Sequence, residues 1–178
     1  MKLLARVCAA LDSAAVPYAL IGAGAMTVHG VGRSTLDLDL LTIDAAVLSE
    51  KFWATPTGGV TTDVRRGDRD DPLAGVVRFT MPEEAPVDLV VGRSAWQGGV
   101  LKRASRMRIG EATIPIVGAA DLILLKLFAG GSQDAWDIDQ LLSVGDRSAL
   151  VADVESRVGD LPVEAGVLWV RIRGTAKS

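Results

Sequence analysis

The sequence is poor in the residues that build disulfide scaffolds and zinc sites. Its 178 residues include one cysteine, Cys8, and one histidine, His29. A single thiol cannot close a disulfide within the chain. A lone histidine with no second histidine or cysteine partner gives little support to a zinc site or a Ser-His triad. Cys8 lies in an apolar run, residues 3–11, where we expect a small buried hydrophobe.

Aromatic residues and long apolar runs are scarce as well. Four Trp, three Phe and one Tyr leave few platforms on which single-stranded bases could stack. No segment approaches the roughly 20 apolar residues of a membrane span. Arg6 and Asp12 interrupt the N-terminal apolar stretch, where a signal peptide needs a continuous apolar core. We therefore expect a cytoplasmic protein with no membrane partner.

A large excess of either charge is absent too. The net charge is -3, which gives no general attraction for nucleic acid. With 49% hydrophobic residues, the chain is long enough for one sizeable core and unlike a disordered protein. Basic residues gather in the acid-free stretch 93–108, which favours an exposed face over an anion-binding strip. The charged stretch 65–72 is typical of a solvated hairpin loop, because its arginines oppose calcium binding.

Hydrophobic periodicity predicts an α/β (α+β-like) chain. Apolar residues three and four apart predict helices, and short runs bounded by Gly or Pro predict strands. We expect strands at 18–21, 36–41, 60–64, 75–81 and 86–91 and a hairpin at 106–117. We expect helices at 3–15, 25–29, 44–54, 95–104, 121–128, 134–142, 148–158 and 163–172. The pattern predicts a mixed sheet flanked by helices in residues 1–117, with a helical extension, 118–178, packed on that core.

Three aspartates stand out on these strands. Asp37 and Asp39 are two apart, so they share one face of a strand. Asp88 lies in the middle of the apolar strand 86–91, where burying an unpaired carboxylate is costly. Carboxylate oxygens are ligands that Mg²⁺ prefers, and a pair of such ions can hold both the attacking and leaving oxygens of a phosphoryl displacement. Asp37 and Asp39 alone would fit a solvated strand face; with Asp88 the pattern favours a metal site.

A glycine turn precedes the aspartates. Gly22-Ala23-Gly24 follows a strand and opens a short helix, where free backbone N–H groups can hold phosphate. The alternative is the dinucleotide fingerprint G-x-G-x-x-G. Thr27 occupies its third glycine position, and the acidic strand comes too early for the acidic residue of that motif. A Rossmann dehydrogenase is therefore disfavoured.

The glycine turn, the short helix ending His-Gly and the run Arg-x-Thr-x-Asp-x-Asp together resemble the nucleotidyltransferase superfamily. In particular they are similar to small prokaryotic members related to abortive-infection and tRNA-modifying toxin nucleotidyltransferases. The resemblance implies the nucleotidyltransferase fold and a catalytic, metal-binding triad of Asp37, Asp39 and Asp88. It also implies nucleotide binding by Gly22, Ala23, Arg33, Ser34, Thr35, Lys126 and Asp134. Without the resemblance, Lys126 fits a snorkelling lysine on a partly buried helix.

The activity implied by the resemblance is a metal-dependent transfer, with Mg²⁺ or Mn²⁺. A nucleoside monophosphate would pass from an NTP such as ATP to a hydroxyl on a tRNA end, a protein or a small molecule, with an antitoxin as a further partner. This chain has Ala23 where relatives have Gly or Ser, and Gly131 and Gln133 where relatives often carry Arg and Lys. These departures keep a second hypothesis open, that of a weak or inactive nucleotide-binding or toxin–antitoxin partner protein.

Overall fold

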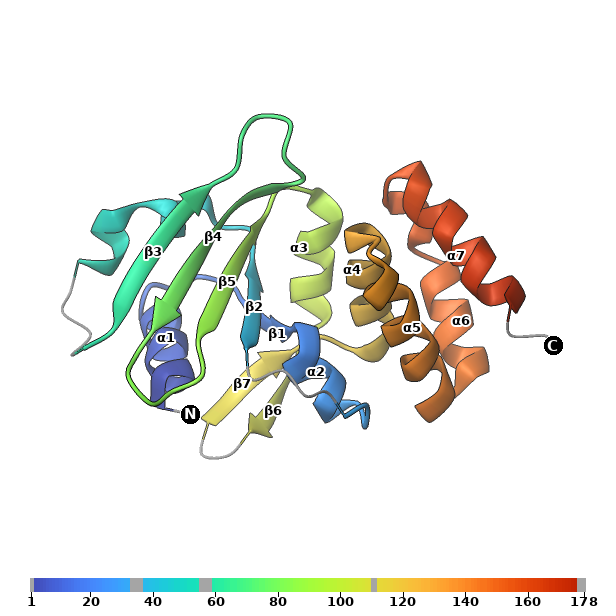
Figure 1. The fold of residues 1–178 in the computed structure, drawn as a ribbon, viewed down its shortest axis with the longest axis horizontal. Helices are drawn as coiled ribbons and strands as arrows, with labels where there is room; N and C mark the ends of the chain where they lie inside the picture. Colours follow the sequence, from blue (N-terminus) through green and yellow to red (C-terminus); the bar gives the residue numbers. More distant parts are fainter. Residues whose placement is uncertain (1, 33–36, 55–58, 110–111, 176–178) are drawn as a thin grey trace. The chain divides into compact units, whose positions relative to one another are not determined.

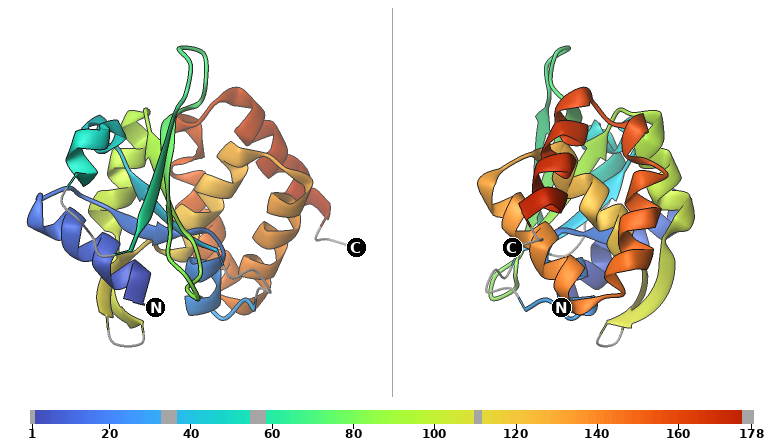
Figure 2. Two further views of the ribbon diagram at one scale, coloured as in Figure 1. Left: turned by 60° about the vertical axis from the view of Figure 1, so that its left-hand side comes forward. Right: turned by 90° about the vertical axis from the view of Figure 1, so that its right-hand side faces the viewer.

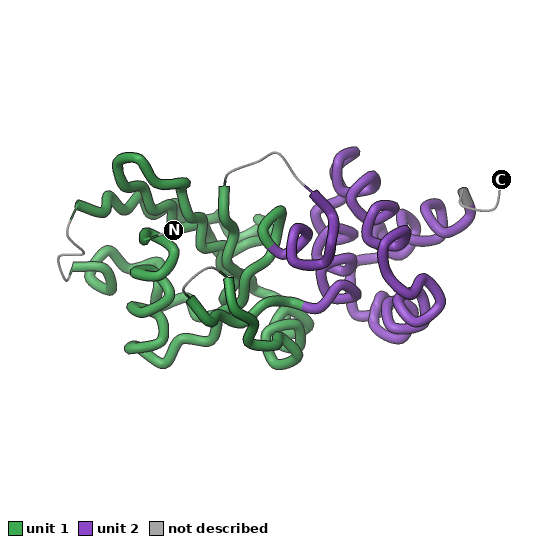
Figure 3. The backbone as a smooth tube through the Cα atoms, turned by 90° about the horizontal axis from the view of Figure 1, so that it is seen from below, with its two compact units in different colours: residues 1–24, 34–117 green, residues 25–33, 118–178 purple. Residues whose placement is uncertain are grey.

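The computed structural model of the chain describes residues 2–32, 37–54, 59–109 and 112–175 (Figure 1). Three of the expected nucleotide-binding residues, Arg33, Ser34 and Thr35, lie outside the described residues. The chain forms two compact units, Met1–Gly24 with Ser34–Val117, and Ala25–Arg33 with Gly118–Ser178 (Figure 3). The expected division into domains after residue 117 stays a prediction, because compactness alone does not show which parts fold independently.

The first unit is built on a mixed sheet, as predicted. In the described residues its strands follow the spatial order β3-β4-β5-β2-β1-β7-β6. The pairs β2–β5 and β1–β7 are parallel, and the other neighbouring pairs are antiparallel. The strands are β1 (Ala19–Ile21), β2 (Leu38–Thr42), β3 (Thr61–Arg66), β4 (Leu73–Thr80), β5 (Val87–Gly92), β6 (Ser105–Ile109) and β7 (Ala112–Ile116).

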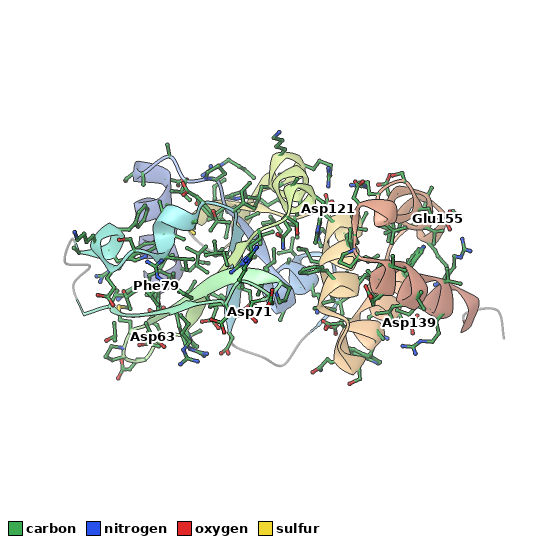
Figure 4. The ribbon with its side chains drawn as sticks, turned by 90° about the horizontal axis from the view of Figure 1, so that it is seen from above. Asp63, Asp71, Phe79, Asp121, Asp139 and Glu155 are labelled. Carbon is green, nitrogen blue, oxygen red and sulfur yellow. The ribbon has the colours of Figure 1, made fainter. Side chains whose placement is uncertain are left out.

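The central strands have one apolar and one polar face. Alternate residues of β4 from Gly75 onward and of β5 are buried, and these residues include Val77, Phe79, Val87, Leu89 and Val91 (Figure 4 labels Phe79). Figure 2 shows α1 (Lys2–Ser13) and α3 (Ala95–Arg103) together on one side of this sheet. The apolar stripe of α1, including Cys8, is buried as the helical spacing predicted. The alternate residues of β4 and β5, Arg78 and Asp88 among them, belong to the opposite face, which we call the polar face.

Two expected elements differ from the structure. The helix predicted at 44–54 is a pair of 3-10 turns, Ala45–Leu48 and Glu50–Trp53. Asp44 caps the first turn as expected, accepting a hydrogen bond from the backbone N–H of Ala46 at 2.9 Å. Ser49 between the turns has an extended backbone, which no continuous helix tolerates. The expected glycine turn is itself the first turn of α2 (Gly22–Val28).

The second unit contains the helical extension that the sequence predicts. Its helices are α4 (Ala119–Ala129), α5 (Ser132–Val144), α6 (Arg147–Glu155) and α7 (Val163–Thr175), with a short 3-10 turn at Val158–Asp160. Gly130 ends α4 in the left-handed conformation, at φ 69°, that glycine adopts without steric cost. Within the described residues, no helix combines the length and apolar character needed to cross a membrane.

Candidate active site

Asp39 and Asp88 lie beside each other at the centre of the sheet. They are direct partners in the parallel pairing of β2 with β5. Adjacent strands lie about 4.8 Å apart, so the two carboxylates share a face as close neighbours. The same row continues through Arg78 on β4 to Asp63 on β3. Residues far apart in the chain thus form one charged row across the polar face.

Arg78 connects two of the three predicted metal ligands. One guanidinium nitrogen lies 3.4 Å from Asp37 Oδ2 and another 3.5 Å from Asp88 Oδ2. Sequence reasoning missed Arg78, although a signal existed. A single arginine in the apolar strand 75–81 is as unusual as a single aspartate in 86–91, and both charges meet in the folded chain.

The environment of Asp88 shifts the pKa of its carboxyl upward. Burial raises the pKa of this carboxyl above its usual range, the guanidinium of Arg78 opposes that rise, and the carboxylate of Asp37 adds to it. Its Oδ1 atom is buried and accepts no hydrogen bond from the described residues. A buried carboxylate oxygen in this state gains strongly from any cation or proton donor that reaches it.

Gly22 brings the start of α2 against Asp39. Its φ of +58° is a conformation that side-chain-bearing residues rarely adopt. A methyl group placed on Gly22 would also overlap the carboxylate of Asp39. Only glycine therefore allows this close approach. Ala23, the expected nucleotide-binding residue after it, lies in the same first turn of α2.

The donor set fits a divalent cation in its chemistry. Asp37, Asp39 and Asp88 offer carboxylate oxygens on one face of the sheet, and the buried Oδ1 of Asp88 lacks a partner in the described part of the chain. Within that part no three acidic, histidine or cysteine side chains already converge as a ligand set. Arg78 instead supplies positive charge to Asp37 and Asp88. A cation would therefore have to replace this arginine.

Lys126 and Asp134 are in contact in the second unit. Lys126 Nζ lies 3.0 Å from Asp134 Oδ1 and 2.6 Å from Asp137 Oδ2. The lysine head is thus held in ion pairs, unlike that of a snorkelling lysine. Asp137 was missed, although Asp134 and Asp137 are three apart on one helix face and Asp137 is 1% exposed. Nucleotide binding by Lys126 and Asp134 stays a prediction.

Comparisons with known proteins agree with the fold. No protein-family model and no curated protein sequence matches the chain. The solved structure of the antibiotic-resistance factor ANT(2'')-Ia is 13% identical, with a TM-score of 0.52 over 98% of this chain and 91% of that chain. The lincosamide antibiotic adenylyltransferase LnuA is 15% identical, with a TM-score of 0.50 over 81% and 97%.

A third similar structure is an antigenic nucleotidyltransferase-like protein from Paracoccidioides brasiliensis. It is 16% identical, with a TM-score of 0.50 over 91% of this chain and 88% of that chain. Identities this low show a shared fold and not a shared substrate. The chain has the nucleotidyltransferase fold, as the sequence predicted.

Proposed function

We propose that this protein is a nucleotidyltransferase, moving a nucleoside monophosphate from an NTP to a hydroxyl acceptor. One observation carries the proposal: Asp39 and Asp88 pair across β2 and β5 on one face of the sheet, beside Asp37. Three acids placed together in a nucleotidyltransferase fold repel one another, and Arg78 supplies one positive charge to Asp37 and Asp88, where a divalent cation would supply two. A function that recruits a cation explains why they are there.

Asp37 and Asp39 would hold Mg²⁺ or Mn²⁺, and Asp88 would join them on the acceptor side. When bound, such a metal would supply positive charge that neutralises charge developing in the phosphoryl transfer. Asp88 accepts the proton of the acceptor hydroxyl, whose oxygen then bonds to the α-phosphorus. The bond from that phosphorus to the bridging oxygen breaks, and pyrophosphate leaves with the electron pair. The backbone at the start of α2, Gly22 and Ala23, would hold the phosphates, as the sequence predicts.

The proposal covers several classes of acceptor that carry a hydroxyl group. The sequence resemblance favours a tRNA end or a protein in a toxin–antitoxin setting, with ATP as one donor. The solved neighbours add small molecules: LnuA was determined with lincomycin bound and ANT(2'')-Ia with adenylyl-2''-tobramycin. All these acceptors are compatible with the same carboxylate row, because the row acts on a hydroxyl and a phosphorus only.

A transfer assay tests the proposal. The protein is incubated with each α-³²P-labelled NTP, with Mg²⁺ or Mn²⁺, and with cellular RNA, protein or small-molecule fractions. We expect label transfer that falls at least a hundredfold in Asp39→Asn and Asp88→Asn, since each removes a carboxylate at the reacting centre. Asp70→Asn is the matched control, because Asp70 is an exposed carboxylate in the loop after β3 and lies outside the proposed triad. Equal losses in all three variants would contradict these roles.

The second candidate function is a nucleotide-binding or antitoxin-binding protein with little activity. Its support is the ion pairing of Arg78 with Asp37 and Asp88, which occupies two of the three carboxylates. No transfer with any NTP and any fraction would favour this candidate, provided that the fractions support an active relative run in parallel.

A further inference from the structure

A cavity of about 480 Å³ lies against strand β4 and the β3–β4 hairpin. Asp88 of the neighbouring strand β5 forms part of its wall. Its lining includes Asp88 and Arg78 from the charged row, Arg65 and Val76 from β3 and β4, and Asp71 and Pro72 from the hairpin loop. Figure 4 labels Asp71 in that loop and Asp63 on β3. This volume is in the range of small-molecule sites. The carboxylate that we place at the acceptor hydroxyl therefore forms part of a cavity wall.

Arginines dominate the charge of this wall. Three arginines line the cavity against two aspartates. Arg66 donates a hydrogen bond to the Leu48 carbonyl at 2.8 Å, which directs its guanidinium to another part of the unit. Arg65 and Arg78 lie on the polar face, since Arg65 is two residues from Asp63, the register partner of Arg78. Arg65 Nε also lies 2.9 Å from Asp63 Oδ2, in an exposed ion pair.

The two aspartates of the cavity wall interact with other groups. Asp71 Oδ2 accepts a hydrogen bond from the backbone N–H of Asp68 at 2.5 Å, within the loop. Asp88 is the proposed partner of the divalent cation. Once that cation is bound, Arg78 loses the contacts that now neutralise it. Arg65 contacts Asp63 through Nε, and an ion pair this exposed contributes little in water, so both guanidinium groups can turn nitrogens toward a ligand. Guanidinium binds phosphate oxygens in pairs.

The strand order separates this cavity from the expected NTP phosphates. Gly22 follows β1, on one side of Asp39, whereas Arg78 and Arg65 lie on β4 and β3, on the other side of Asp88. Transfer requires the acceptor oxygen and the leaving pyrophosphate to lie on opposite sides of the α-phosphorus. The carboxylates stand between the two regions, so the arginine side is the side for the acceptor.

We propose that the cavity is the acceptor subsite and that it takes a small hydroxyl compound bearing a phosphate group, held by Arg65 and Arg78. This inference rests on the proposed function, because that function makes Asp88 the group at the acceptor hydroxyl. An amine-bearing acceptor would meet like charge in this cavity. In an acceptor that bears a phosphate group, the phosphate oxygens would contact the two arginines. The acceptor hydroxyl of the same compound would then lie toward Asp88.

Calorimetric titration tests the subsite directly. Glycerol 3-phosphate is the probe, glycerol is its neutral counterpart, and a short oligoribonucleotide with a free 3′ hydroxyl tests whether the phosphate can come from RNA. Each is titrated in Mg²⁺, with and without a non-hydrolysable NTP analogue. We expect glycerol 3-phosphate to bind at least tenfold more tightly than glycerol. Arg65→Gln should weaken that binding about tenfold, as expected for one lost charge-assisted contact.

Arg69→Gln is the matched control. It removes the same charge from the same hairpin, and Arg69 is exposed and does not line the cavity. Equal losses in Arg65→Gln and Arg69→Gln, or equal binding of glycerol and glycerol 3-phosphate, would overturn the subsite. So would a loss of analogue binding in Arg65→Gln as large as the loss of probe binding, since the cavity would then belong to the NTP.

The failure of the proposed function looks different. In that case the protein binds no NTP analogue in Mg²⁺ or Mn²⁺, whereas the Arg65-dependent preference for glycerol 3-phosphate is still measured without nucleotide. Tighter binding of the oligoribonucleotide, again weakened by Arg65→Gln and displaced by glycerol 3-phosphate, would support the phosphate subsite and assign its phosphate to RNA. Oligoribonucleotide binding that is unchanged in Arg65→Gln would exclude RNA as the source of the phosphate in this subsite.

Discussion

Gly22 allows the closest approach in the site, between the first turn of α2 and Asp39. In Gly22→Ala the new methyl group meets that carboxylate and the backbone is held at a φ of +58°. We expect the free energy of unfolding to fall by about 1–3 kcal/mol, the usual cost of such strain. We also expect a smaller rise in melting temperature on adding Mg²⁺, because Asp39 is displaced.

Gly32→Ala is the control for this prediction. A methyl group on Gly32 would have no atom within 4 Å, and its backbone is not in the left-handed region. Its unfolding midpoint in urea should stay within about 0.5 kcal/mol of the wild type. Similar behaviour of the two variants would mean that Gly22 and Asp39 are not in close contact.

The sequence allowed individual site residues to be recognised, but it did not allow their contact partners to be predicted. Asp88 was recognisable because a carboxylate inside an apolar strand needs a partner. Its partner was not, because the pairing of Arg78 with Asp88 depends on β4 lying beside β5. Strand neighbours are decided by packing of the whole sheet, which no local pattern contains. The same holds for Asp39, whose position next to Asp88 requires β2 beside β5.

At the scale of elements, Arg93, which follows β5, is hydrogen-bonded to the β3–β4 hairpin loop. Its guanidinium donates hydrogen bonds to the carbonyl oxygens of Gly67, Asp68 and Arg69, at 3.1, 2.6 and 3.0 Å. The basic stretch 93–108 was predicted only as an exposed face. Its basic residues are exposed as predicted, and one of them, Arg93, also contacts the loop that supplies Asp71 to the cavity.

We expect Arg93→Ala to speed hydrogen exchange at the backbone amides of Gly67 and Asp71. The free energy of unfolding should change by no more than about 1 kcal/mol, since the contacts are exposed. Exchange measured by mass spectrometry gives the readout. Lys102→Ala removes the same charge from the exposed end of α3 and serves as control. If loop exchange is unchanged in Arg93→Ala, the arginine does not order the loop.

Elements with strong local signals were predicted well. The apolar periodicity of α1 and the Gly130 stop of α4 both depend on neighbours within one or two turns. The segment 44–54 was predicted wrongly as one helix, although its cap at Asp44 was correct. Ser49 ends the first 3-10 turn there, and serine competes with helical hydrogen bonding through its own side chain.

At the scale of the whole chain, the second unit has a buried charged cluster of its own: Lys126, Asp134 and Asp137. We expect Lys126→Met to lower the free energy of unfolding by about 3 kcal/mol, because Asp137 is almost fully buried and loses its cation. Urea denaturation measures this, and the second change Asp137→Leu should recover part of the loss. The exposed Lys51→Met is the control.

The opposite result would be equally informative. If Lys126→Met leaves stability unchanged and weakens NTP binding, the lysine serves the nucleotide, as the sequence resemblance implied, and the ion pairs with Asp134 and Asp137 contribute little to folding.

The sheet of the first unit ends in β3 on one side and β6 on the other. Outermost strands expose unpaired backbone groups, which are templates for joining another molecule. Here both carry exposed arginines, Arg65 and Arg66 on β3 and Arg106 and Arg108 on β6. Two copies meeting at these margins would bring like charges together. Arg65, which the proposed phosphate subsite uses, thus belongs to an edge whose charge also disfavours polymerisation of the protein through its own sheet at high concentration.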